Sequence, residues 1–122
     1  MSLTTLIVDD HAGFRASVRV LLEMEGFDVV GEAADGATAV AAADRLRPQF
    51  VLLDVQLPDM QGFDVAREIL NRGLTECVVL VSSRDASDYG DSIASSGALG
   101  FVPKVELSGD RLRALLTEPT CG

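Results

Sequence analysis

The stretch FVLLDVQLPDMQG, residues 50–62, decides the fold of this chain. Its first four residues are apolar, Asp54 follows them directly, and Pro58 stiffens the loop that comes next. A short unbroken apolar run between turn signals is typical of a strand buried on both faces, as in a parallel sheet. A carboxylate that ends such a strand lies at the carboxyl edge of the sheet, where open α/β sheets bind ligands. Asp54 is therefore a candidate site residue, although an Asp in a turn often serves only as a local cap.

Similar apolar runs recur along the chain and alternate with helical patterns. Further strands are expected over Leu3–Val8, Phe27–Ala33, Cys77–Val81 and Leu99–Val102. Apolar spacings of three and four predict helices from Asp10 or His11 to Gly26, over Ala37–Arg47, from Gly62 to Gly73, over Asp85–Ser96 and from Ser108 to Leu116. A side-chain oxygen near Asp10 or His11 is expected to cap the first helix, and Ser108 the last. Five alternating pairs predict an α/β fold, a single doubly wound parallel sheet, as one domain over residues 1–122.

Composition limits the classes of function. The chain has 122 residues, a net charge of −9, 48% hydrophobic residues and only 5% aromatic ones. Such acidity argues against sequence-independent nucleic-acid binding and against an anionic membrane surface, since both need clustered Lys and Arg. Cys77 and Cys121 are too few for a disulfide framework, and neither a signal peptide nor an 18-residue apolar run is visible. We therefore expect a reduced, cytoplasmic protein.

The predicted helix over Asp85–Ser96 has the weakest helical pattern. It contains Gly90 and four serines, all poor helix formers. We expect it to be the least stable helix of the domain, so that a rearrangement there would cost little free energy.

Polar residues follow four of the apolar strands. These residues are Asp9 and Asp10, then Asp54, then Ser82 and Ser83, and last Lys104. Taken singly, each has an ordinary interpretation as a cap, a turn or a solvated charge. Because the carboxyl ends of parallel strands share one edge of the sheet, however, these residues are expected to meet in one shallow cleft.

The chemistry of that cleft follows from its charges. Three neighbouring carboxylates are tolerated only if they bind protons or a cation. Hard oxygen ligands with open positions suit Mg²⁺, with Mn²⁺ as an alternative. A Lys and a Ser nearby can donate to a developing negative charge. The set therefore predicts phosphoryl transfer to a carboxylate nucleophile.

These residues resemble the receiver domain of two-component response regulators, the CheY-like family. The resemblance extends from Leu3 to about Leu116 and depends on the motifs VDDH (8–11), LLDVQLPDMQGFDVA (52–66), VSSR (81–84) and GALGFVPK (97–104). The segments VDDHAGFR, VVGEAADG and LGFVPKVELSGDRLRALL are most similar to the NarL/FixJ-type subfamily, whose receivers precede a DNA-binding module. The family implies a flavodoxin-like sheet of strand order 2-1-3-4-5.

The resemblance also implies a metal site and a phosphoacceptor. Asp54 would accept the phosphoryl group in a reaction that needs Mg²⁺. Asp10 and Asp54 would bind the ion directly, Asp9 would act through water, and the main-chain carbonyl of Gln56 would be a further ligand.

Other positions would act on the phosphoryl group. Lys104 would contact it, and Ser82 would donate its hydroxyl to a phosphoryl oxygen. Phe101 would be the aromatic switch residue that moves into the space left by Ser82, although it has an equally good interpretation as strand core. Gln56 and Arg84 occupy the two variable positions that tune the lifetime of the phosphorylated state.

The family implies a switch and not a conventional enzyme. Its members accept the phosphoryl group from a sensor histidine kinase or phosphotransfer protein, and then hydrolyse it. The output surface would be the fourth helix, fifth strand and fifth helix, with dimerisation there as one option. Direct binding of nucleic acid or membrane by these residues is not expected.

One departure and three alternatives remain. Many receivers have a cis proline after the lysine, whereas Val105 follows Lys104 here, so a trans bond is predicted. A haloacid-dehalogenase-like phosphatase would need an acid where Gln56 stands. A flavodoxin-like cofactor binder would need a phosphate loop in place of DDHAGF. A degenerate receiver would bind partners without phosphorylation.

Overall fold

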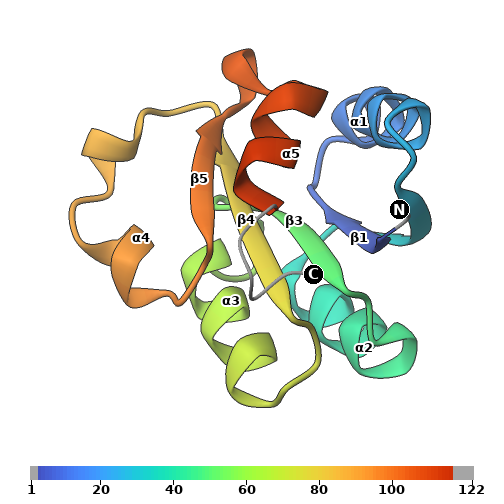
Figure 1. Cartoon of the computed structure of the whole chain (residues 1–122). Coiled ribbons are helices and arrows are strands. Elements are labelled where there is room, and N and C mark those ends of the chain that lie inside the picture. Colours follow the sequence, from blue (N-terminus) through green and yellow to red (C-terminus); the bar gives the residue numbers. More distant parts are fainter. Residues whose placement is uncertain (1–2, 117–122) are drawn as a thin grey trace.

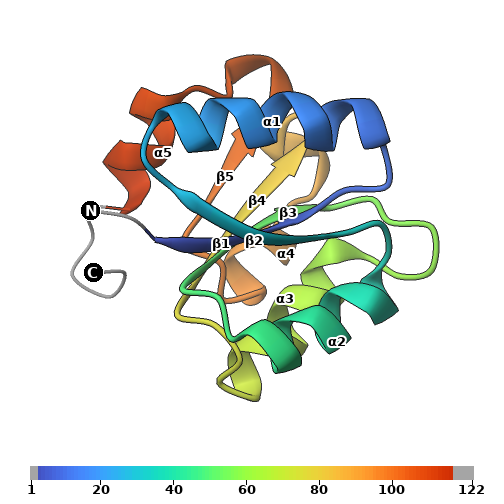
Figure 2. The ribbon, with the colours of Figure 1, turned by 90° about the vertical axis from the view of Figure 1, so that its right-hand side faces the viewer.

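The computed structural model describes residues 3–116, which form one parallel sheet between two layers of helices (Figures 1 and 2). The strand order is β2-β1-β3-β4-β5, so the predicted fold and order are confirmed. In chain order the elements are β1 (Thr4–Val8), α1 (Ala12–Met24), β2 (Asp28–Ala33), α2 (Gly36–Leu46), β3 (Phe50–Asp54), α3 (Gly62–Asn71), β4 (Cys77–Ser82), η1 (Ala86–Asp88), α4 (Ser92–Ser95), β5 (Gly100–Pro103), η2 (Lys104–Glu106) and α5 (Gly109–Leu116).

The helices cover the sheet on both faces. Figure 2 shows α1 and α5 on one face and α2 and α3 on the other. Every residue of β3 and β4 is buried, as expected for central strands of a sheet covered on both sides. The burial of β2 is mixed along its length, which agrees with its position at the edge. Alternate strand residues therefore enter two separate hydrophobic clusters, one under each helical layer.

The expected cap of the last helix is confirmed and that of the first is not, whereas α2 has a cap that was not predicted. Asp35 accepts a hydrogen bond from the N–H of Thr38 at 2.8 Å at the start of α2. Ser108 accepts one from the N–H of Arg111 at 3.1 Å at the start of α5. His11 stands at the N-cap of α1 but makes no side-chain cap bond, so the predicted cap there is wrong. The preceding loop is stabilised instead by Asp9, whose carboxylate accepts from the N–H of His11.

The segment between β4 and β5 is helical only in two short pieces. The prediction of one helix over Asp85–Ser96 is wrong in extent, because η1 has three residues and α4 only four. Gly90 separates them with a φ of +57°, in the left-handed region that glycine adopts readily. Low helix propensity and this turn explain why a continuous helix does not form.

The state of Cys77 differs from the expectation. Cys77 is disulfide-bonded, which corrects the expectation of a reduced thiol. The expectation was based on the reducing conditions of the cytoplasm. Those conditions do not show whether the fold brings two cysteines close enough to bond. Cys121 lies outside the described residues.

Within residues 3–116, no helix has the length and apolar character needed to cross a bilayer.

Candidate functional site

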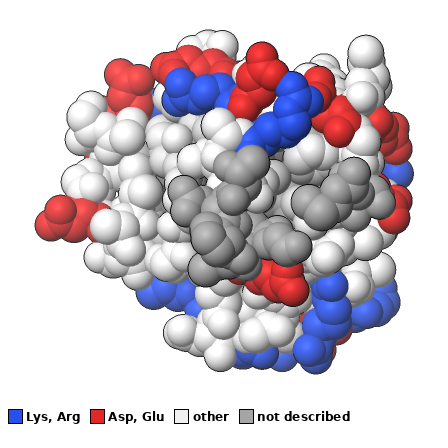
Figure 3. All heavy atoms as spheres, in the orientation of Figure 1, with Lys and Arg blue, Asp and Glu red and all other residues white. Residues whose placement is uncertain are grey.

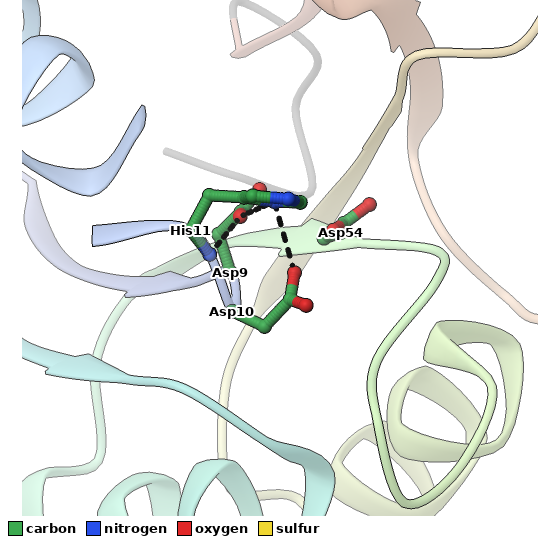
Figure 4. A group of neighbouring side chains, drawn as sticks. All are labelled: Asp9, Asp10, His11 and Asp54. Atoms are coloured by element: carbon green, nitrogen blue, oxygen red, sulfur yellow. Dashed lines mark hydrogen bonds and ion pairs between the residues drawn. The ribbon is translucent and has the colours of Figure 1, made fainter. Parts of the chain in front are cut away.

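Asp9 and Asp54 are brought together by the pairing of β1 with β3. Val8 and Leu53 are opposite each other in the parallel register, so the next residue of each strand emerges at the same edge. Both carboxylates are buried, with Asp9 at 0% and Asp54 at 3% exposure. Asp10 and His11 continue from Asp9, and the four side chains offer ligand atoms that all lie within 4.8 Å of one another (Figure 4). The predicted acidic cluster therefore exists, and His11 is an addition that the sequence analysis did not assign to it.

The backbone and one oxygen of Asp9 are held by hydrogen bonds. Its N–H donates to the carbonyl of Ala33 at 3.0 Å, and its own carbonyl accepts from Arg15 Nη1 at 2.5 Å. Its Oδ1 atom accepts from the N–H of His11 at 2.8 Å and lies 3.2 Å from Nδ1 of the same imidazole. His11 Nδ1 also lies 3.1 Å from Oδ1 of Asp10. These contacts hold the carboxylates of Asp9 and Asp10 next to each other.

The second carboxylate oxygen of Asp9 is suited to binding a cation. Oδ2 lies 2.6 Å from Lys104 Nζ, an ion-pair distance. Its geometry is nevertheless not that of a hydrogen bond, and Oδ2 is the one buried side-chain N or O atom within residues 3–116 without such a bond. A buried carboxylate oxygen is costly unless another charge balances it. With Asp10 and Asp54 beside it, this oxygen makes the cluster a fitting site for a hard divalent cation.

Asp54 has an unusual acidity for an aspartate. Burial raises its pKa to about 6, and the negative charge of Asp9 acts in the same direction. Lys104 and the N–H of Gln56 lower it again, because each stabilises the carboxylate form. Lys104 Nζ is 3.6 Å from Asp54 Oδ2, and the N–H of Gln56 donates to Asp54 Oδ1 at 3.3 Å. A divalent cation would neutralise the carboxylates and favour the ionised form of Asp54.

Lys104 is positioned from the opposite side of the cleft. It follows β5 directly, and its ammonium group lies 4.3 Å from the ring centroid of Phe14 on α1. A cation over an aromatic face is attracted electrostatically, so Phe14 helps to keep Lys104 between the two buried carboxylates. Phe14 was not among the residues predicted for the site. No sequence signal could have indicated this contact, which depends on where α1 lies relative to the residue that follows β5.

Ser82 is buried, and within residues 3–116 its side-chain hydrogen bonds are to Tyr89 and Arg84 and not to the carboxylates. Its Oγ atom lies 2.6 Å from the hydroxyl of Tyr89 and accepts from the N–H of Arg84 at 3.1 Å. Phe101 is half-buried and packs against the ring of Tyr89, with centroids 5.8 Å apart. Phe101 thus packs against the core cluster beneath α2 and α3, in line with its interpretation as a core residue of the strand.

The remaining predicted positions lie around the rim. The side chains of Gln56, Ser83 and Arg84 are exposed. Gln56 forms an isolated bridge with Gln61, which closes the loop after β3. The described residues contain no cis peptide, so the predicted trans bond between Lys104 and Val105 is confirmed.

A glycine shapes the floor of this loop. The N–H of Gly62 donates to the carbonyl of Val55 at 2.6 Å. A Cβ atom at Gly62 would lie 2.3 Å from the carbonyl oxygen of Asp54, closer than any real contact. The absence of a side chain therefore lets α3 begin directly against the end of β3.

Comparisons with known proteins point to one family. Residues 5–117 match the family described as response regulator receiver domain. The chain is 38% identical over 101 residues to the transcription regulator BvgA of Bordetella pertussis, covering 83% of this chain and 48% of BvgA. It is 32% identical over 104 residues to the DNA-binding transcriptional activator EvgA of Escherichia coli K12, covering 85% of this chain and 51% of EvgA.

Solved structures agree with these relatives. The signal receiver domain of NarL from Mycobacterium tuberculosis superposes with a TM-score of 0.80 at 32% identity, covering 93% of this chain and 96% of that one. The chain spans about half the length of the curated regulators BvgA and EvgA.

Proposed function

Because the chain belongs to the response regulator receiver family, we propose that it is a phosphorylation switch whose phosphoacceptor is Asp54. The observation that carries this proposal is the convergence of two buried carboxylates, Asp9 and Asp54, on the ammonium group of Lys104. The carboxylate of Asp54 therefore has the ammonium group of Lys104 beside it, and the exposed residues Gln56 and Arg84 lie nearby in the chain. Such a group can accept a phosphoryl group and later lose it to water.

The first step forms a mixed anhydride on Asp54. One of its carboxylate oxygens attacks the phosphorus of a phosphohistidine, so that a P–O bond forms as the P–N bond of the donor breaks. Mg²⁺, when bound, neutralises charge on the phosphoryl oxygens. Asp9, Asp10, Asp54 and the main-chain carbonyl of Gln56 are the proposed residues that hold it. Hydrolysis reverses the loading when water attacks the phosphorus and the same P–O bond breaks.

Four side chains would act on the transferred group. Lys104 would move from its ion pair with Asp9 toward the phosphoryl oxygens. This movement would be short, because Lys104 Nζ already lies 3.6 Å from Asp54 Oδ2. Ser82 would donate its hydroxyl to another of these oxygens. Gln56 and Arg84, exposed at the rim, would control the approach of water and thereby the lifetime of the phosphate.

The partners follow from the family and from the relatives. The donor would be a sensor histidine kinase or a phosphotransfer protein. BvgA and EvgA are regulators of transcription, so the matching role for this chain is the receiver part of a longer regulator. The output surface would be formed by α4, β5 and α5, and a homodimer could use it. In Figure 3 the left-hand side, where Figure 1 places α4, is mainly uncharged, which suits contact with another protein.

The test is direct phosphorylation by a small donor. The protein is incubated with Mg²⁺ and acetyl phosphate, and its intact mass is measured. We expect one acid-stable, base-labile adduct, which is absent in Asp54→Asn and without Mg²⁺. A control variant, Asp64→Asn, removes an exposed carboxylate of α3 and should retain the adduct. No adduct in the wild-type protein would contradict the proposal and favour a receiver that binds partners without phosphorylation. Phosphate release from many unrelated monoesters would favour a phosphatase.

A further inference from the structure

Tyr89 makes a contact with Ser82 that the proposed reaction has to break. The two hydroxyl oxygens are 2.6 Å apart, and Ser82 is completely buried. Ser82 Oγ also accepts from the N–H of Arg84. A serine hydroxyl has one proton and two acceptor positions. Its hydrogen-bonding capacity is therefore largely used by partners in the segment that follows β4.

The contact lies on the face of the sheet opposite to that of Asp54. Side chains alternate along a strand, and Ser82 continues the series of Val78 and Leu80, which belong to the cluster under α2 and α3. Asp54 continues the series of Phe50 and Leu52, which belong to the cluster under α1 and α5. To reach a phosphoryl group on Asp54, the hydroxyl of Ser82 has to turn away from Tyr89.

The ring of Tyr89 is packed between two other aromatic rings. Its centroid is 5.3 Å from that of Phe63 on α3 and 5.8 Å from that of Phe101 on β5. The ring of Tyr89 therefore contacts the predicted switch residue Phe101 while its hydroxyl group contacts Ser82. Tyr89 also stands at the C-cap of η1 and directly precedes Gly90. Together with Ile93, it attaches a weakly helical segment to the core.

We propose that Tyr89 is a positioning residue that holds Ser82 in the unphosphorylated arrangement, and that its release transmits phosphorylation to residues 86–95. This inference rests on the proposed phosphorylation of Asp54. The phosphoryl group and the Tyr89 hydroxyl compete for one serine. Whatever strengthens one interaction weakens the other by the same factor.

The first experiment removes only the hydroxyl. Tyr89→Phe keeps the ring between Phe63 and Phe101 but frees Ser82. The binding of beryllofluoride, a phosphoryl mimic, is measured in the presence of Mg²⁺ by fluorine NMR. We expect the apparent Kd to fall by a factor of about 2 to 10, the range set by one hydrogen bond. In a Ser82→Ala background the same Tyr89→Phe substitution should leave the Kd unchanged, because no serine remains to be released.

The second experiment uses the only tyrosine of the chain. With one Tyr and no Trp, the ultraviolet absorption and emission of tyrosine report on Tyr89 alone. Beryllofluoride with Mg²⁺ should change this signal in the wild-type protein, and Ser82→Ala should abolish most of the change. An unchanged signal, or equal Kd values for wild type and Tyr89→Phe, would overturn the inference while leaving an Asp54 adduct intact. If no adduct forms at all, the proposed function fails and this inference with it.

Discussion

Lys104 Nζ lies 2.6 Å from Oδ2 of Asp9, and this ion pair joins the ends of β5 and β1 across the two strands that separate them. The pair is largely buried, since the side chain of Lys104 is 17% exposed and that of Asp9 is 0% exposed. The same ammonium group is 3.6 Å from Asp54. Lys104 therefore supplies positive charge to two carboxylates that would otherwise repel each other.

Removal of Lys104 should destabilise the metal-free protein. Lys104→Ala leaves Asp9 buried without a counter-charge, and we expect the free energy of unfolding to fall by about 1–3 kcal/mol. Urea denaturation in EDTA measures this change. Arg67→Ala, which removes an exposed pair with Asp64 on α3, should alter stability by less than about 1 kcal/mol. Equal losses in both variants would contradict the assigned role of Lys104.

Neutralising Asp54 should stabilise the metal-free protein above pH 6. The folded-state pKa of Asp54 is raised to about 6 from an ordinary value of 3.8. Between these values the folded state binds more protons than the unfolded state, so stability falls as pH rises and the loss is complete above the folded pKa. Asp54→Asn removes the penalty, and we expect a gain of about 1–3 kcal/mol at pH 8 and little gain at pH 4. Urea denaturation at both pH values in EDTA tests this.

Asp59 provides a control of opposite sign. Hydrogen bonds from the N–H groups of Gly36 and Ala37 lower the pKa of its carboxyl group. Asp59→Asn should therefore destabilise the protein at neutral pH, with the effect lost as pH falls through the lowered pKa. If Asp54→Asn and Asp59→Asn shift stability in the same direction at pH 8, the assignment for Asp54 is wrong.

Mg²⁺ should stabilise the wild-type protein in a saturable way. A ligand at one hundred times its Kd adds about 2.7 kcal/mol to the free energy of unfolding. Asp10 is partly exposed, at 35% for its side chain, so Asp10→Asn should fold normally in EDTA but lose most of this gain. Thermal unfolding across a Mg²⁺ titration measures both quantities. A full Mg²⁺ response in Asp10→Asn would exclude that carboxylate as a ligand.

Gly62 should not tolerate a side chain. Its added Cβ would overlap the Asp54 carbonyl oxygen, and we expect Gly62→Ala to lower the free energy of unfolding by about 1–3 kcal/mol. Gly13 in α1 has nothing within 4 Å of the corresponding position. Gly13→Ala should stabilise by about 0.5–1 kcal/mol, because alanine is the better helix former. Chemical denaturation should show that the two substitutions change the free energy of unfolding in opposite directions.

The segment over residues 86–95 should exchange its amide hydrogens faster than β4. It contains only a three-residue and a four-residue helical piece, whereas every residue of β4 is buried. Hydrogen exchange with and without beryllofluoride tests this expectation and its link to the site. Uniform protection of the segment in both states would contradict a role in signalling.

The sequence by itself determined the fold and the membership of the acidic cluster. Apolar runs predicted the strands, and Asp9, Asp54 and Lys104 each stand at or just after the end of one of them, with Asp10 next to Asp9. In a parallel sheet all strands end at the same edge, so residues distant in the chain have to meet there whatever the loops do. For this reason the cluster could be predicted without knowing a single side-chain contact.

Only the tertiary structure decided how these groups are held. The ring of Phe14 beneath Lys104, the imidazole of His11 between two carboxylates, and the hydroxyl of Tyr89 on Ser82 are contacts between particular rotamers. Tyr89 comes from a segment whose predicted helix does not form as a continuous element, so helical spacing could not place it. Periodicity reports which face of an element is buried, whereas such contacts depend on the path of the loops and on how the elements pack against one another.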